Sequence, residues 1–127
     1  MASLNPFRIS LITDFSWGKI VLNDHRQYKD AKISYKSSIN WDWSEYGTSH
    51  GTGINKKDTD WLIGEGCTCI ILTTGVHDRI SHNSETHMYL KQFGIEVREM
   101  NSTTAYSIFN NLIRNGVKVG ILLHSTC

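Results

Sequence analysis

Three apolar runs in the second half of the chain decide the fold: CTCIILT (67–73), IEVREM (95–100) and VKVGILLH (117–124). Each run has the length of a buried strand, and helical patterns that stop at glycine separate the runs. The order strand–helix–strand–helix–strand is typical of an α/β domain. We therefore predict strands at Cys67–Thr73, Ile95–Met100 and Val117–His124.

Three helices are predicted around these strands. The first, Asn55–Glu65, begins with Asn55 as N-cap and has Asp58 three residues later, an approximate capping box. Its charged residues are interpreted as a solvated face: Lys56, Lys57, Asp58 and Asp60. The second helix starts at Ser84 and stops at Gly94. The third is capped by Ser102 or Thr103 and ends at Asn115-Gly116. Its apolar stripe is Ala105, Ile108, Phe109, Leu112 and Ile113.

The first third of the chain reads as a small antiparallel β unit. Trp17–Leu22 and Lys29–Ser37 are predicted strands, and Ile39–Trp43 continues in an extended pattern. Residues 47–53 (GTSHGTG) form a loop by composition. The residues thus predict a mixed sheet with helices packed on it and a small β layer that joins or covers it.

Composition limits the functions that this chain can have. Its 127 residues suit one domain, and a net charge of +1 argues against nucleic-acid binding. The apolar runs are far shorter than the roughly 20 residues of a membrane span. Three cysteines are too few for a disulfide framework and indicate a reducing compartment. We expect the cytoplasm, with the mitochondrion as the alternative.

Several short motifs together resemble one known family. They are Trp17-Gly18-Lys19, Tyr28-Lys29-Asp30, Trp41-Asp42-Trp43, Gly47-Thr48-Ser49-His50, Phe93-Gly94-Ile95-Glu96-Val97 and the ending GILLHSTC from Gly120 to Cys127. They look like those of the adipogenesis-associated MTH-domain-containing proteins, the eukaryotic branch of a widespread small-domain family. The resemblance runs from about Phe15 to Cys127. It implies an N-terminal extension at 1–14 and a single MTH-type domain at 15–127.

The resemblance implies a three-layer α/β fold with a mixed central sheet. It also implies a mostly cytoplasmic protein linked to preadipocyte differentiation, and a more distant branch contains mitochondrial complex I assembly factors. The family brings no established catalytic residues. At residues 73–77 (TTGVH) this chain departs from the glycine-richer loop expected after the strand.

The carboxyl ends of the strands are the place where open α/β sheets bind ligands. Those ends are Thr73-Thr74-Gly75, Met100-Asn101-Ser102 and His124-Ser125-Thr126. Their hydroxyls, with helix amides at Ser84 and Thr103, could bind a small anion, although helix capping and turns explain most of them.

Trp41, Asp42 and Trp43 form the sharpest local feature. In an extended segment the two indoles share one face, with Asp42 on the other. They either close the core or form a partner-binding patch, because Trp is enriched at interface hot spots. Asp42 could pair with Lys19 or His50.

Common catalytic and metal motifs are missing from the sequence. Neither a G-x-G-x-x-G after a strand nor a phosphate-binding P-loop occurs. His124, Ser125 and Cys127 suggest nucleophilic chemistry, but neighbours in a strand face opposite ways and a terminal Cys is usually mobile. The spacings of His82 with His87 and of Cys67 with Cys69 do not match zinc motifs. The histidines are interpreted as scattered surface residues, and no cofactor or metal is expected.

The leading hypothesis is therefore a non-enzymatic interaction protein, an adaptor or assembly factor. It would bind an unidentified protein partner, with no nucleic acid or membrane, as a monomer or weak homo-oligomer. The alternative is a small-molecule-binding domain or orphan enzyme with a pocket at the strand ends. The candidate surface consists of Trp41, Asp42, Trp43, His50, Thr73, Thr74, Gly75, His77, His124 and Ser125.

Overall fold

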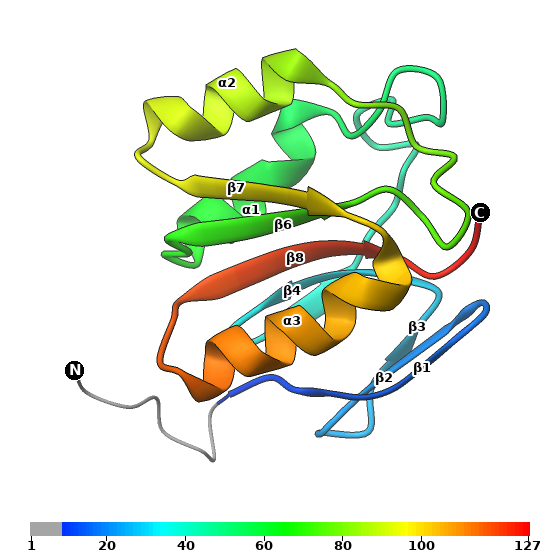
Figure 1. Cartoon of the computed structure of the whole chain (residues 1–127), viewed down its shortest axis with the longest axis vertical. Coiled ribbons are helices and arrows are strands. Elements are labelled where there is room, and N and C mark those ends of the chain that lie inside the picture. Colours follow the sequence, from blue (N-terminus) through cyan, green and yellow to red (C-terminus); the bar gives the residue numbers. More distant parts are fainter. Residues whose placement is uncertain (1–8) are drawn as a thin grey trace.

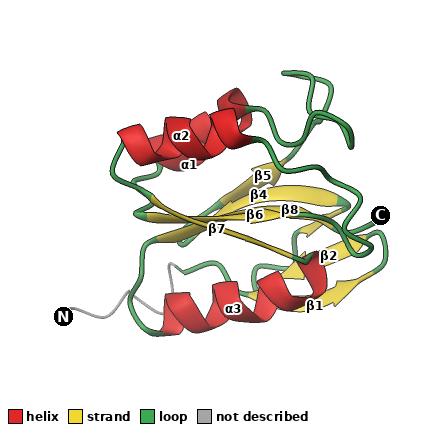
Figure 2. Ribbon diagram, turned by 45° about the horizontal axis from the view of Figure 1, so that its top comes forward, coloured by secondary structure: helices red, strands yellow, loops and turns green. Residues whose placement is uncertain are grey.

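The structure, a computed structural model, describes residues 9–127 and has three layers (Figures 1 and 2). The strands are β1 (Ile12–Ser16), β2 (Lys19–Leu22), β3 (Gln27–Tyr28), β4 (Asp30–Ser34), β5 (Ser38–Asn40), β6 (Cys69–Thr73), β7 (Glu96–Met100) and β8 (Val119–His124). The helices are a 3₁₀ turn η1 (Lys56–Thr59), α1 (Asp60–Gly64), α2 (Ser84–Gln92) and α3 (Ser102–Arg114). In Figure 2, α1 and α2 lie on one face of the sheet, and α3 lies on the other with β1–β3.

The central sheet has the strand order β5-β4-β8-β6-β7 and is mixed. Strand β6 pairs in parallel with both β7 and β8, whereas β4 runs antiparallel to β8. The three strands predicted from the second half of the chain are therefore confirmed. The β4–β5 hairpin joins this sheet rather than the small layer, because β4 pairs with β8 along its whole length, from Asp30 opposite His124 to Ser34 opposite Gly120.

The small layer is a separate sheet of β1, β2 and β3. Strand β1 begins at Ile12, three residues before Phe15, where the family resemblance starts. Asn110 of α3 fixes this strand, since its side chain donates to the Ile12 carbonyl at 2.8 Å and accepts from the Ile12 N–H at 2.9 Å. Trp17 and Gly18 form the turn between β1 and β2 rather than the start of a strand, and Gly18 has a positive φ of 75° there.

Alternating side chains of the central strands belong to two hydrophobic cores, one on each face of the central sheet. Ile71 and Ile121 pack with Phe109 of α3 and with the small layer. Ile70 and Leu122 pack on the opposite face with α1, α2 and Trp41. Cys67 lies in this second core and Cys69 in the first, so the two thiols face opposite sides. Residues two apart within one strand would face the same side, but Cys67 precedes β6, which begins at Cys69.

Asparagines cap the helices. The side chains of Asn55, Asn83 and Asn101 each accept a hydrogen bond from a first-turn backbone N–H. Asn55 was predicted, whereas the cap of α3 is Asn101 rather than Ser102 or Thr103. The Thr103 N–H, one of the two helix amides considered above for a small anion, is therefore already bound to Asn101.

Asp58 is the largest departure from the sequence interpretation in this region. Its side chain is fully buried instead of lying on a solvated helix face. Across residues 9–127, none of the helices combines the length and the apolar character needed to cross a bilayer.

Candidate functional site at the carboxyl end of β8

The segment that follows β8 is held from two sides. The Gly18 N–H donates to the Ser125 carbonyl at 3.0 Å, which ties it to the β1–β2 turn. On the other side, the N–H groups of Val76 and Arg79 donate to the carbonyls of Thr126 and Cys127 at 3.2 and 3.1 Å. These bonds give residues 125–127 a defined place between two loops.

Gly75 makes the close approach of these two loops feasible. Its φ is +98°, and a Cβ at this position would lie 2.6 Å from the Cys127 carbonyl oxygen. A side chain would therefore require both a strained backbone and a displacement of Cys127. Gly75, a predicted site residue, acts here through the backbone.

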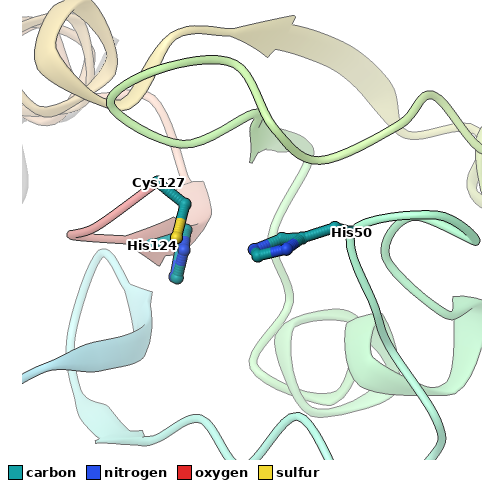
Figure 3. Close-up of side chains that lie close together, drawn as sticks. All are labelled: His50, His124 and Cys127. Carbon is teal, nitrogen blue, oxygen red and sulfur yellow. The ribbon is translucent and has the colours of Figure 1, made fainter.

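Three potential ligand side chains meet at this place: His50, His124 and Cys127 (Figure 3). One ring nitrogen from each histidine and the Cys127 sulfur all lie within 4.8 Å of one another. His50 comes from the loop before η1, and the other two from the end of β8. His50 is exposed, Cys127 is half-buried and His124 is buried, so the cluster opens to solvent on one side.

Asp30 fixes the ring of His124. The Nδ1 atom of His124 lies 2.7 Å from Oδ1 of Asp30, and Nε2 lies 3.2 Å from the Thr126 hydroxyl. Burial disfavours the charged imidazolium, but hydrogen bonds with Asp30 and Cys127 outweigh it, so the pKa of His124 is raised. The hydrogen bond with His124, followed by that with Thr126, lowers the pKa of the Cys127 thiol.

Trp43 forms one wall of this cluster. Its ring centroid lies 4.4 Å from that of His124 and 5.3 Å from that of His50. Trp41 lies behind it, at 5.4 Å between the ring centroids. Trp41 is buried in the core and Trp43 is half-buried, so one indole supports the fold and the other borders the site.

A second aromatic pair lies on the other side of residues 125–127. Trp17, at the tip of the β1–β2 turn, contacts His77, with 5.4 Å between the ring centroids and 45° between the ring planes. Its side chain is 59% exposed. The Gly18–Ser125 hydrogen bond places the turn that carries Trp17 next to the segment that carries His124 and Cys127.

The other predicted surface residues belong to the framework. Ser125 is fully buried and donates to the Lys29 carbonyl. Thr73 is buried, donating to the Leu122 carbonyl and accepting from the His124 N–H. Thr74 binds Asp78. Asp42 points into solvent and accepts from Ser44, which contradicts the predicted pairing with Lys19 or His50.

Four of the six histidines lie in two clusters, whereas the sequence interpretation has them scattered over the surface. Besides His50 and His124, His82 and His87 lie 4.4 Å apart between ring centroids. Both bind the carboxylate of Glu99 at 3.2 Å. Residues five apart at the start of α2 thus meet through the end of β7, which a linear spacing cannot show.

A buried ion pair lies in the layer of α1 and α2. Nζ of Lys32 is 3.4 Å from Oδ1 of Asp58, and the two side chains are 7% and 0% exposed. The Thr48 hydroxyl donates to the other oxygen of Asp58 and also accepts from the Asn55 N–H at 2.9 Å. The pair fastens the loop that carries Trp43 and His50 to the central sheet.

A small cavity lies at the ends of β6 and β7, with Thr73, Thr74 and Glu99 in its lining. It has room for no more than a water molecule. The geometry at these strand ends therefore favours contacts on the surface over an enclosed ligand pocket.

Residues 12–124 match the model of a protein family of unknown function, DUF498/DUF598. The chain belongs to this family. The match covers nearly all of the residues that the structure describes, including His50 and His124.

The DUF498 domain is also similar to solved structures. A Bartonella henselae protein described as an outer membrane protein is 17% identical, with a TM-score of 0.75 over 94% of this chain and 97% of that one. A Mth938-like domain from Bordetella pertussis is 13% identical, with a TM-score of 0.70 over 98% of this chain and 91% of that one. A conserved hypothetical protein from Pyrococcus horikoshii is 17% identical, with a TM-score of 0.75 over 91% and 98%.

At these identities the similarity shows the fold alone. The predicted three-layer α/β architecture is confirmed, and the Mth938-like description agrees with the MTH-type domain inferred from the motifs.

Sequence reasoning does not identify two residues of this candidate site, Cys127 and Trp17. Cys127 was set aside as a mobile terminal residue, although backbone hydrogen bonds hold it beside His124. Trp17 was assigned to a strand. The Trp-Gly pair was the available signal, because a glycine with positive φ commonly closes a hairpin and places its neighbour at the tip.

Proposed function

We propose that this protein is a non-enzymatic adaptor or assembly factor that binds a protein partner through the surface around residues 125–127. This surface consists of Trp17, Trp43, His50, His77 and Cys127. The observation that carries the proposal is Trp17, an indole that is 59% exposed yet is held in one place. Its ring contacts the tilted ring of His77, and the backbone N–H of the next residue, Gly18, donates to Ser125.

An ordered, exposed indole is suited to protein recognition. Trp contributes a large contact area with few rotatable bonds and is enriched among residues that dominate binding energy. Because Trp17 is already positioned, binding would cost little side-chain entropy. His77 beside it, and His50 and half-buried Trp43 at the neighbouring cluster, would supply polar and aromatic contacts around this anchor.

The family resemblance supports a place for this surface in differentiation or complex assembly. The proteins that the motifs resemble are linked to preadipocyte differentiation, and more distant ones assemble mitochondrial complex I. We extend the proposal accordingly to adipogenesis in organisms with such cells, with the cytoplasm as the first compartment and the mitochondrion as the second.

The test is affinity purification of the tagged full chain from cytoplasmic and mitochondrial fractions, followed by mass spectrometry of proteins and small molecules. Trp17→Ala is compared with the wild type and with Phe93→Ala. Phe93 is a matched control because it is an aromatic residue of similar exposure, 53%, just after α2 on the opposite layer.

We expect one stoichiometric protein that is retained by the wild type and by F93A but lost from W17A. Equal retention by W17A would place the contact elsewhere. A tightly held metabolite without any protein partner would instead favour the small-molecule alternative.

A further inference from the structure

The His50–His124–Cys127 cluster has a property that the proposed contact surface does not require. Two imidazoles and a thiol converge, although their residues come from segments more than seventy positions apart in the chain. In Figure 3, the His50 ring points across the gap toward His124 and Cys127. Imidazole nitrogen and thiolate sulfur are the donor atoms that bind zinc most often.

The surroundings of His124 resemble the outer shell of a metal ligand. Asp30 contacts Nδ1 at 2.7 Å, which leaves Nε2 as the ring nitrogen available to a metal. Histidines that bind metals commonly donate their second ring N–H to a carboxylate, which fixes the ring and makes the ligating nitrogen more basic. Trp43 packs on the same ring at 4.4 Å and limits the access of water from that side.

We propose that His50, His124 and Cys127 bind one Zn²⁺ ion, with the fourth coordination position open to solvent or to an incoming ligand. Three protein ligands and an open position are the arrangement of a zinc site that exchanges a ligand, whereas structural sites have four protein ligands. A mixed set of nitrogen and sulfur favours Zn²⁺ over Mg²⁺ or Ca²⁺, which prefer oxygen.

The required adjustment is small. Bonds of about 2.0 Å to nitrogen and 2.3 Å to sulfur in a tetrahedral site place the ligand atoms roughly 3.3–3.6 Å apart. The three atoms lie within 4.8 Å of one another, so closure needs a shift of about 1 Å. His50 is exposed and Cys127 half-buried, so their side chains can rotate toward the fixed ring of His124. The Thr126 hydroxyl, 3.2 Å from Nε2, would give way to the ion.

The second histidine cluster provides an internal control. His82, His87 and Glu99 satisfy the same distance criterion, but this set lacks a thiol and its imidazoles already share one carboxylate. A cobalt–thiolate charge-transfer band can therefore report on the first cluster and not on the second. The buried thiols Cys67 and Cys69 lie outside both clusters.

The experiment is a Co²⁺ titration of the metal-free full chain, followed by displacement with Zn²⁺. We expect one Co²⁺ per chain with a near-ultraviolet charge-transfer band that Zn²⁺ abolishes. Cys127→Ser should remove the band, and His50→Ala should weaken Zn²⁺ binding by about tenfold or more. The His82→Ala/His87→Ala double variant should retain the band. Asp30→Asn should keep the band but weaken binding by about 10- to 100-fold, the usual effect of losing an outer-shell carboxylate.

Binding without a charge-transfer band, or a band that persists in C127S, would overturn the proposal. The proposal would also be overturned if Zn²⁺ affinity fell in the H82A/H87A variant and not in H50A. Circular dichroism of C127S and H50A checks that both variants fold, as expected for side chains at the edge of the core. The titration uses the isolated chain, so its outcome is independent of the partner-binding experiment with W17A.

Discussion

Two polar clusters flank the loop of residues 41–55, and they differ in how completely their groups are bound and buried. The Lys32–Asp58 pair on one side is almost wholly inaccessible, and the Thr48 hydroxyl completes it. The His50–His124–Cys127 cluster on the other side opens to solvent. Opposite charges that pair inside a protein hold two segments of the chain in contact. Ligand atoms that converge at an open edge are instead available to a bound molecule or ion.

The comparison of these two clusters shows that a concentration of polar side chains does not by itself mark a functional site. Lys32 and Asp58 would attract attention in any survey of buried charge, yet they bind each other and leave no accessible group. The open cluster contains fewer formal charges, but its ring nitrogens and sulfur point toward a shared space.

The largest expected effect comes from breaking the closed cluster. Asp58→Ala leaves the Lys32 ammonium buried without its carboxylate, and we expect a loss of about 3–5 kcal/mol in the free energy of unfolding. Urea denaturation at neutral pH measures this loss. Lys57→Ala, an exposed neighbour in η1, should change the stability by less than about 0.5 kcal/mol.

A Lys32→Met/Asp58→Ala double variant sharpens this result. Removing both charges should restore part of the stability lost in D58A, because the remaining cost is then packing rather than an unpaired charge. If the double variant were as unstable as the sum of the single ones, the pair would not be the fastening interaction described here.

An intermediate effect is expected at the open cluster from Gly75→Ala. The added methyl group would meet the Cys127 carbonyl oxygen at 2.6 Å while the backbone keeps its φ of +98°. We expect a loss of roughly 1–3 kcal/mol in unfolding free energy and a displacement of Cys127. Gly51→Ala is the matched control, since a Cβ there meets nothing within 4 Å. Equal melting temperatures for the two variants would contradict the close contact.

The smallest expected effect is a shift in the pH dependence of one thiol. The hydrogen bond with His124 lowers the pKa of the Cys127 thiol. Its thiolate should therefore form at a lower pH than that of an ordinary cysteine, whose pKa is about 8.5. Burial raises the pKa of Cys67 to about 12 and that of Cys69 to about 11, so neither should react in the folded chain.

The rate of alkylation by iodoacetamide, measured against pH, tests this shift. The midpoint should lie below that of a free thiol in the wild type and move upward in His124→Gln. Cys127→Ser should abolish the reaction. If the midpoint were the same in H124Q and in the wild type, His124 would not be the cause of the lowered pKa of Cys127.

The regular elements could be predicted from the sequence because their apolar residues are periodic. The runs at 67–73 and 117–124 contain strands β6 and β8, in which every residue is buried. The stripe that contains Ala105, Phe109 and Ile113 packs α3 on the sheet. Strand β1 was missed because its burial does not alternate clearly. Thr13 and Asp14 are both exposed, and only Ile12 is fully buried.

The site was predicted only in part, because its contacts depend on loops without periodicity. His50 and His124 were among the candidate residues, but nothing in their spacing shows that they meet. Asp58 is expected to be a capping residue because the sequence does not reveal that Lys32 of β4, twenty-six positions earlier, pairs with it.

The two outermost strands of the central sheet set a limit on self-association. Strand β5 has only three residues, and β7 carries Glu96, Arg98 and Glu99 along its length. Short or charged borders discourage another chain from continuing the hydrogen-bond ladder. Even at high concentration, the folded protein should therefore not form fibres by pairing these edge strands between chains. Contacts between copies should instead involve side chains and loops.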